Sequence, residues 1–103
     1  QSRDFGYVAN VVQANISAAF TEGIAGEVFN IACGKRITIN AMVAQIEAIA
    51  GRQLPKSHDQ PRPGDIRCSM ADISRARERL GYRVEVDFRE GLSKTFDYFS
   101  RNI

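Results

Sequence analysis

The clearest structural signal in the chain is the stretch Thr38-Ile39-Asn40-Ala41-Met42-Val43-Ala44-Gln45-Ile46-Glu47-Ala48-Ile49-Ala50-Gly51. Its large apolar residues recur every three or four positions, which is the spacing of one face of an amphipathic helix. Thr38 has the side chain of an N-cap, and Gly51 stands where a helix is expected to end. The sequence therefore predicts a helix between these two residues.

Two more helices are predicted on the same grounds on either side of this one. Apolar residues at helical spacing predict a helix over residues 10–20. A shorter helix is predicted over residues 73–80. Asp72 opens it, because its carboxylate can accept from free backbone N–H groups, and Gly81 closes it.

A fourth helix is predicted at the C-terminal end of the chain. Asp87 and Glu90 have the spacing of a capping box, in which the first residue caps the helix that follows. The apolar face of this helix consists of Phe88, Leu92, Phe96 and Phe99. We expect it to run nearly to the last residue.

Extended segments and one long loop separate these helices. Residues 27–32 are β-branched or aromatic and precede Gly34, which predicts a strand buried on at least one face. Alternation over residues 66–70 predicts a second short strand, and residues 83–86 a third. Three prolines fall in residues 53–65, which predicts a long loop of the kind that often carries function. The whole chain, residues 1–103, is thus expected to be one α/β unit, with helices and a few short strands.

The composition is that of a small polar domain. Of the 103 residues, 44% are hydrophobic and 25% are charged, and the formal net charge is +2. No window approaches the roughly 18 apolar residues of a membrane helix, and the first residues lack the apolar centre of a signal peptide. We therefore expect a cytoplasmic protein that does not bind membranes. Cys33, Cys68 and His58 are too few for a zinc site, so both cysteines are expected to be reduced thiols.

Several motifs for cofactor binding and catalysis are absent from the sequence. The close glycine pair Gly23 and Gly26 precedes a predicted strand instead of joining a strand to a helix, so there is no dinucleotide fingerprint. No tyrosine is followed four residues later by lysine, so the chain has no Tyr/Lys pair. His58 has Ser57 and Asp59 as direct neighbours, but adjacent side chains point apart and rarely form a triad. We expect a solvated loop histidine.

Two motifs that contain arginine are chemically more informative. Arg3-Asp4-Phe5-Gly6-Tyr7-Val8 leads into the first helix, and Arg62-Pro63-Gly64-Asp65 closes the proline-containing loop. The planar guanidinium group suits phosphate because it donates paired, charge-assisted hydrogen bonds. A carboxylate such as that of Asp65 can accept from sugar hydroxyls. Taken alone, each motif also fits a solvated arginine or a salt bridge.

As a set, these segments resemble the C-terminal third of an extended short-chain dehydrogenase. They are most similar to UDP-glucose 4-epimerases, especially the UDP-N-acetylglucosamine 4-epimerase branch. The similarity runs from Arg3 to about Phe99, with the segments in the family's order and at its spacing. Besides the two arginine motifs, it rests on Val11-Val12-Gln13-Ala14-Asn15, Val28-Phe29-Asn30-Ile31-Ala32-Cys33-Gly34, Ile66-Arg67, Ala71-Asp72-Ile73-Ser74-Arg75-Ala76 and Leu80-Gly81-Tyr82.

The resemblance implies a two-part enzyme with an N-terminal NAD-binding domain and a smaller substrate domain. Such enzymes oxidise the C4 hydroxyl of a UDP-sugar by hydride transfer to NAD and return the hydride to the other face. It implies that Arg3 and Arg62 bind the nucleotide diphosphate, that Asp65 binds the ribose, and that residues 28–32 rejoin the sheet of the NAD domain. The NAD site and the catalytic Tyr/Lys pair belong to the part that this chain lacks. No catalytic, cofactor-binding or metal-binding residue is therefore assigned, and the chain alone is expected to be inactive.

Some features depart from the family pattern, and other functions remain open. Ala9 stands where the family has an acidic residue, which leaves Asn10 as the expected cap of the first helix. The chain begins at Gln1 without an initiator Met, which favours a partial sequence. Nucleotide-sugar dehydratases and decarboxylases share the diphosphate-binding residues, so they remain alternatives.

A binding domain that stands alone and forms a homodimer is another alternative, because the missing domain would leave an apolar surface uncovered. Nucleic-acid binding is not expected, although Arg75, Arg77 and Arg79 lie on one predicted helix. Acidic residues such as Glu78 and Glu85 interleave with the arginines there and keep the local charge mild.

Overall fold

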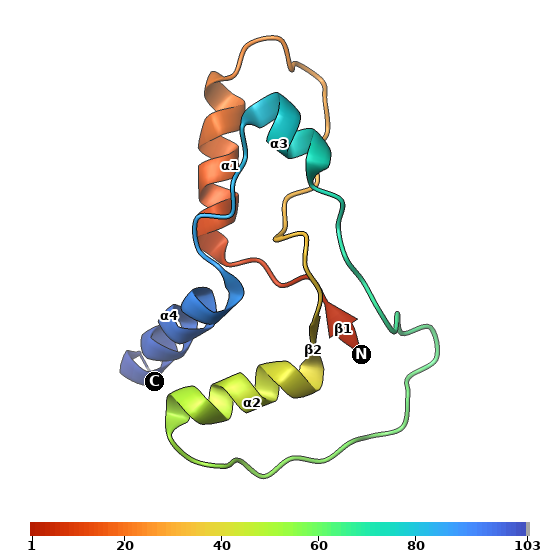
Figure 1. Cartoon of the computed structure of the whole chain (residues 1–103), viewed down its shortest axis with the longest axis vertical. Helices are drawn as coiled ribbons and strands as arrows, with labels where there is room; N and C mark the ends of the chain where they lie inside the picture. Colours follow the sequence, from red (N-terminus) through yellow and green to blue (C-terminus); the bar gives the residue numbers. More distant parts are fainter. Residues whose placement is uncertain (103) are drawn as a thin grey trace.

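The computed structural model describes residues 1–102, which form four helices and a two-stranded sheet. The elements are β1 (Ser2–Arg3), α1 (Val8–Phe20), β2 (Ile37–Thr38), α2 (Ile39–Ala50), α3 (Ser74–Leu80) and α4 (Phe88–Arg101). The molecule is thin, with principal extents of 50 × 36 × 20 Å. Two helix pairs lie at opposite ends, α1 with α3 and α2 with α4, and the small sheet lies between them (Figure 1). No described helix is long and apolar enough to span a membrane.

The helix boundaries follow the predicted caps closely. The Thr38 hydroxyl accepts a hydrogen bond from the Ala41 N–H at 3.0 Å, and Gly51 ends α2 in the left-handed conformation with φ of 74°. An Asp87 carboxylate oxygen likewise accepts from the Glu90 N–H at 2.9 Å at the start of α4. At the start of α3, Asp72 accepts from the Ser74 N–H at 2.9 Å. These predictions are confirmed. The sequence could indicate these caps because each depends on residues at most four positions apart.

The predicted role of Asn10 as a helix cap is wrong. α1 begins at Val8, with Tyr7 at the cap position and no side-chain cap bond. Asn10 is only 1% exposed, and its side chain faces the segment before α4. Its amide Nδ2 donates to the Val86 carbonyl at 2.8 Å, and its Oδ1 accepts from the Glu85 and Val86 N–H groups at 3.1 and 3.0 Å. Asn10 thus joins two segments that are 75 residues apart in the chain.

Two of the three strand predictions are also wrong in this structure, and the one over residues 66–70 is confirmed only at Cys68. Residues 27–32 and 83–86 have no regular secondary structure, and within residues 66–70 only Cys68 forms a parallel bridge, with Ser2. The observed strands β1 and β2 are antiparallel, with Ser2 opposite Thr38. A strand requires the backbone of a neighbour as well as suitable side chains. Within the described residues, no ladder partner lies beside residues 27–32.

The core lies between α1, α3 and the segments that join them. It consists of Ala14, Ala32, Ile73, Ala76 and Tyr82. The Tyr82 hydroxyl donates to the Ala32 carbonyl at 2.7 Å, which satisfies the one polar atom that this ring buries. At the other end, Gly91 lets α4 approach Tyr7, because a Cβ at this position would lie 2.7 Å from the Tyr7 Cβ.

Candidate functional site

Arg3 lies at the end of β1, beside the end of the proline-containing loop. Strand β1 has β2 on one side and residues 67–69 on the other: the Ser2 N–H donates to the Arg67 carbonyl at 2.9 Å, and the Ser69 N–H donates to the Ser2 carbonyl at 3.1 Å. The Arg3 guanidinium donates to the Ser2 carbonyl at 2.8 Å and to the Arg67 carbonyl at 3.4 Å. Backbone pairing therefore holds the loop end next to Arg3.

Arg62 and Asp65 form a turn at the end of the same loop. The Asp65 N–H donates to the Arg62 carbonyl at 3.1 Å, with Gly64 in the left-handed region at φ of 81°. The Arg62 Nε lies 3.4 Å from an Asp65 carboxylate oxygen, and the Arg62 side chain is 86% exposed. The structure pairs these two residues with each other. Asp65 is only two residues from Arg67, a chain distance of about 7 Å at most, but Arg3 forms no hydrogen bond or ion pair with the turn.

Asp4 is a polar residue whose structural role the sequence did not indicate. Its carboxylate accepts from the Cys33 and Gly34 N–H groups, both at 2.8 Å, and from the Ala71 N–H at 3.3 Å. These partners are 29, 30 and 67 residues away, so no local pattern could reveal them. Asp4 ties three segments together immediately next to Arg3.

The two cysteines lie in different environments, and neither suggests a metal site. The Cys33 thiol is buried and donates to the Phe5 carbonyl at 3.2 Å. Burial raises the pKa of Cys33, and the nearby Asp4 charge raises it further, which disfavours the reactive thiolate. Cys68 is exposed, and a hydrogen bond with the Ser2 side chain lowers its pKa. Among residues 1–102, no group of three His, Cys, Asp or Glu side chains is arranged to hold a metal ion.

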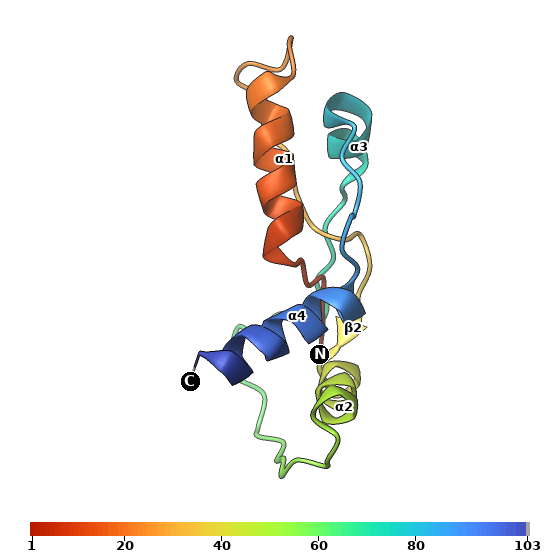
Figure 2. The same ribbon diagram turned by 90° about the vertical axis from the view of Figure 1, so that its left-hand side faces the viewer.

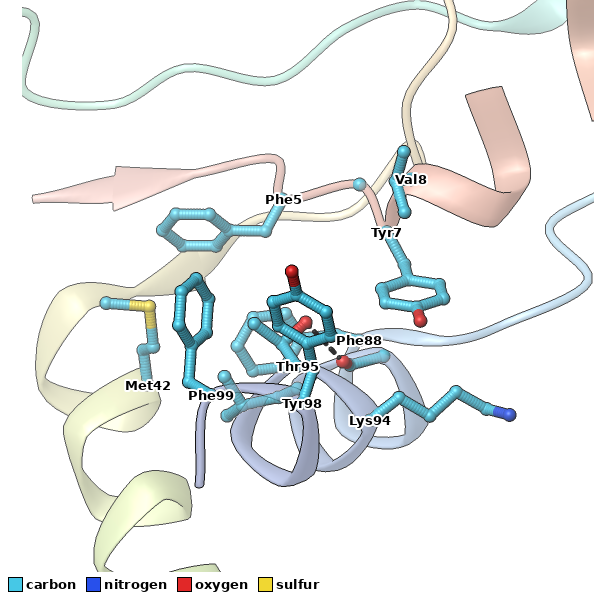
Figure 3. Close-up of a pocket in the computed structure, with 12 residues that line it drawn as sticks. Phe5, Tyr7, Val8, Met42, Phe88, Lys94, Thr95, Tyr98 and Phe99 are labelled. Carbon is cyan, nitrogen blue, oxygen red and sulfur yellow. Dashed lines mark hydrogen bonds between the residues drawn. The ribbon is translucent and has the colours of Figure 1, made fainter. Parts of the chain in front are cut away.

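An aromatic pocket of about 470 Å³ opens between α2, α4 and the segment that follows β1 (Figure 3). Phe5, Met42 and Phe99 gather on one side of it, and Lys94 points away from the rings. The remaining lining residues are Gly6, Tyr7, Val8, Phe88, Gly91, Leu92, Thr95 and Tyr98. None of the three candidate binding residues lines this pocket. Its apolar surface suits an apolar partner better than a diphosphate.

The described residues do not fit the pyrophosphate of a dinucleotide cofactor. Such a group is held where a strand ends in a glycine-rich turn and a helix begins. The turn that contains Gly23 and Gly26 follows α1, and residues 27–36 after it have no regular secondary structure. Both glycines have positive φ, but a Cβ at either position would meet nothing within 4 Å. This turn therefore has no cradle against which a ligand could pack.

Comparison with known proteins shows what this fold and these motifs are similar to. A UDP-glucose 4-epimerase of Thermotoga maritima, solved with UDP-glucose, superposes with a TM-score of 0.90 at 37% identity over 98% of this chain. A UDP-glucuronic acid 4-epimerase of Bacillus cereus, solved with UDP-glucuronic acid and NAD, gives 0.93 at 31% identity over the whole chain. The chain covers 32% and 33% of these two proteins. No family model matches the sequence.

Sequence similarity to curated proteins leads to the same class. A putative UDP-glucose 4-epimerase of Methanocaldococcus jannaschii is 32% identical over 102 residues, which are 99% of this chain and 32% of that protein. The chain thus spans about a third of the length of the relatives that it matches. Its sequence and its fold are similar to those of UDP-sugar 4-epimerases, over a stretch that corresponds to their C-terminal part.

Proposed function

We propose that this chain supplies part of the nucleotide-diphosphate subsite of an NAD-dependent UDP-sugar 4-epimerase. In this proposal, Arg3 and Arg62 bind the diphosphate and Asp65 accepts from the ribose hydroxyls. The sugar and the reacting atoms lie outside the chain, because it contains no Tyr/Lys pair and no dinucleotide fingerprint. The chain alone is accordingly a binding unit that does not turn over sugar or bind NAD.

The observation that carries this proposal is the backbone pairing of β1 with residues 67–69. Through it, Arg3 and the end of the loop that bears Arg62 and Asp65 become neighbours, although they are about 60 residues apart in sequence. Arg62 is exposed and available to a ligand, and a phosphate oxygen can replace Asp65 as its partner. The relatives that were solved with UDP-sugars add support, since they superpose on 98% and 100% of this chain.

Binding of UDP to the ¹⁵N-labelled chain, followed by NMR, tests this proposal. Each charge-assisted contact contributes about 1–3 kcal/mol, so two arginines without the rest of the site should give roughly millimolar affinity. Arg3→Gln and Arg62→Gln should each weaken binding about five-fold or more. Arg52→Gln is the matched control, because this exposed arginine lies at the other end of the loop. Equal losses in all three variants, or none, would rule out the site.

The role of Asp65 has a test of its own. Asp65→Asn should reduce the preference for UDP over its 2′,3′-dideoxy analogue, because the asparagine carries no charge to strengthen hydrogen bonds from the ribose hydroxyls. The affinity for the dideoxy analogue should not fall, since this analogue lacks the ribose contact and the substitution also removes the carboxylate that pairs with Arg62. A preference that is unchanged in Asp65→Asn would remove the ribose contact from the proposal and leave the arginine contacts standing.

We also propose that the isolated chain self-associates as a homodimer. Val28 is 79% exposed, and the outer face of α1 exposes Val8, Val11, Val12, Ile16 and Phe20. Segments with free backbone edges and exposed apolar residues tend to pair. Sedimentation at tens of micromolar should show a dimer that Val28→Glu or Val12→Glu shifts towards monomer. A parent chain that sediments as a monomer and binds no hydrophobic dye would contradict this proposal.

A further inference from the structure

A second pocket shares Phe5 and Phe88 with the aromatic pocket, but its other lining residues carry a different chemistry. Its volume is about 310 Å³, at the lower end of the range for small-molecule sites. Its apolar part consists of Phe5, Phe88, Ile37 and Val84, with the two phenyl rings 5.6 Å apart between centroids. Its remaining lining residues are Cys33, Lys35, Arg77, Arg83 and Asp87.

The charged groups of this pocket are mostly positive and come from separate parts of the chain. Lys35 lies before β2, Arg77 is on α3, and Arg83 follows α3. Within residues 1–102, Lys35 and Arg77 form no salt bridge. Arg83 pairs only with the exposed Glu85, at 3.8 Å. The one acidic lining residue, Asp87, already accepts from the Glu90 N–H as the cap of α4. An anion that enters the pocket would therefore find cations without close partners.

We propose that this pocket binds a small organic anion with a flat apolar body and one phosphate or carboxylate group. The apolar body lies against Phe5 and Phe88, and the oxyanion pairs with Lys35 and Arg77, with Arg83 at the rim. Phosphates and carboxylates match guanidinium geometry, while the low-dielectric wall of phenyl rings strengthens the attraction. Arg3, Arg62 and Asp65 are not among the lining residues, so the site is independent of the proposed diphosphate subsite.

Titration of the ¹⁵N-labelled 103-residue chain with phenyl phosphate tests this inference. Saturable shifts are expected at the amides of Lys35, Arg77 and Val84. Benzyl alcohol keeps the ring without the charge, and inorganic phosphate keeps the charge without the ring, so each should bind at least about five-fold more weakly. Benzoate in place of phenyl phosphate shows which oxyanion the site prefers. Raising the salt concentration from about 50 to 200 mM should weaken binding, because the cations are exposed.

Two variants and one matched control separate this pocket from general charge attraction. Lys35→Gln and Arg77→Gln should each weaken phenyl phosphate binding about five-fold or more. Arg36→Gln should leave it within about two-fold, because Arg36 is exposed, follows Lys35 directly and does not line the pocket. Both lining residues are exposed, so the variants should keep the folded spectrum of the parent. Equal weakening by all three variants, the absence of saturation, or shifts centred on Arg3 and Arg67 would each overturn the proposal.

Discussion

Replacing Asn10 by Ala is predicted to be one of the most destabilising single changes in this chain. Asn10 is 1% exposed and makes three hydrogen bonds to the backbone of Glu85 and Val86, at 2.8, 3.0 and 3.1 Å. It is the polar link between α1 and the segment that leads into α4. Alanine keeps the helix but leaves two N–H groups and one carbonyl without their partners.

The expected loss follows from these three bonds. Each contributes about 1 kcal/mol net, and alanine regains up to about 0.7 kcal/mol through its higher helix propensity. The free energy of unfolding should therefore fall by about 2–3 kcal/mol. A domain of about 100 residues has roughly 5–15 kcal/mol in total, so the melting temperature should drop by roughly 10–20 °C.

Urea and thermal unfolding, followed by circular dichroism, measure this loss. Asn15→Ala is the matched control: Asn15 is exposed on the same helix, and its substitution should change stability by less than about 0.7 kcal/mol. If the two alanine variants unfold alike, the account of Asn10 is wrong.

Asn10→Asp adds a pH signature to the same test. Its carboxylate can still accept from the two N–H groups, but it must be protonated to donate to the Val86 carbonyl. The pKa of this new carboxyl should therefore be higher in the folded state than its unfolded value of about 3.9. Relative to the parent, the variant should be most destabilised at neutral pH, where the new carboxyl is charged. The lost stability should return as the pH falls from the raised folded pKa towards the unfolded value. A stability difference that does not change with pH would show that Val86 is not the partner.

Three further predictions follow from local contacts. Cys68 should be alkylated by iodoacetamide well before Cys33. Cys68 is exposed and the Ser2 hydrogen bond lowers its pKa, whereas burial raises the pKa of Cys33. Mass spectrometry of the digested protein shows the order of alkylation. Glu27→Gln should lower the melting temperature at pH 7 but not at pH values below the folded pKa of Glu27. Arg79 and Arg75 hold that pKa under its ordinary value, so the stabilisation is present above the unfolded pKa and is lost as the pH falls through the folded one. Gly91→Ala should cost about 1–3 kcal/mol in urea unfolding, because its Cβ would clash with Tyr7, whereas Ser93→Ala on the exposed side of α4 should have little effect.

The helices were predictable because their signals are local. Thr38, Gly51 and Asp87 each act on backbone groups within four residues, and all three do so in the structure as predicted. The strands were not predictable, because a β-ladder needs a partner strand, and that partner can lie at any distance in the sequence. Residues 27–32 have strand-like side chains without a paired neighbour, while the short β1 pairs with β2 about 35 positions away. Two-residue strands carry too little side-chain pattern to be recognised.

The candidate site shows the same division between local and distant information. Motif chemistry alone left Arg3 and Arg62 as ordinary surface arginines, and the family resemblance gave them a role. The structure adds the pairing of β1 with residues 67–69: alternation predicts a strand there, but nothing in the sequence indicates that Ser2 is its partner. It also adds Asp4 and Asn10, whose side chains bind backbone groups about 30 to 75 residues away. Asn10 was the expected cap because Ala9 replaces the family's acidic residue, and its actual partners are too distant in the chain for the sequence to indicate.

Arg3 and Asp4 together explain how a very short strand could support the proposed diphosphate subsite. Consecutive residues in an extended segment direct their side chains to opposite sides. On one side, the Asp4 carboxylate accepts hydrogen bonds from the backbone N–H groups of Cys33, Gly34 and Ala71. On the other side, the Arg3 guanidinium donates to the Arg67 carbonyl at the loop end. The bonds to Asp4 fix the backbone from which Arg3 projects, so the geometry of the arginine depends on a residue that need not touch the ligand. Loss of the Asp4 carboxylate should therefore weaken UDP binding under conditions in which the chain is still folded.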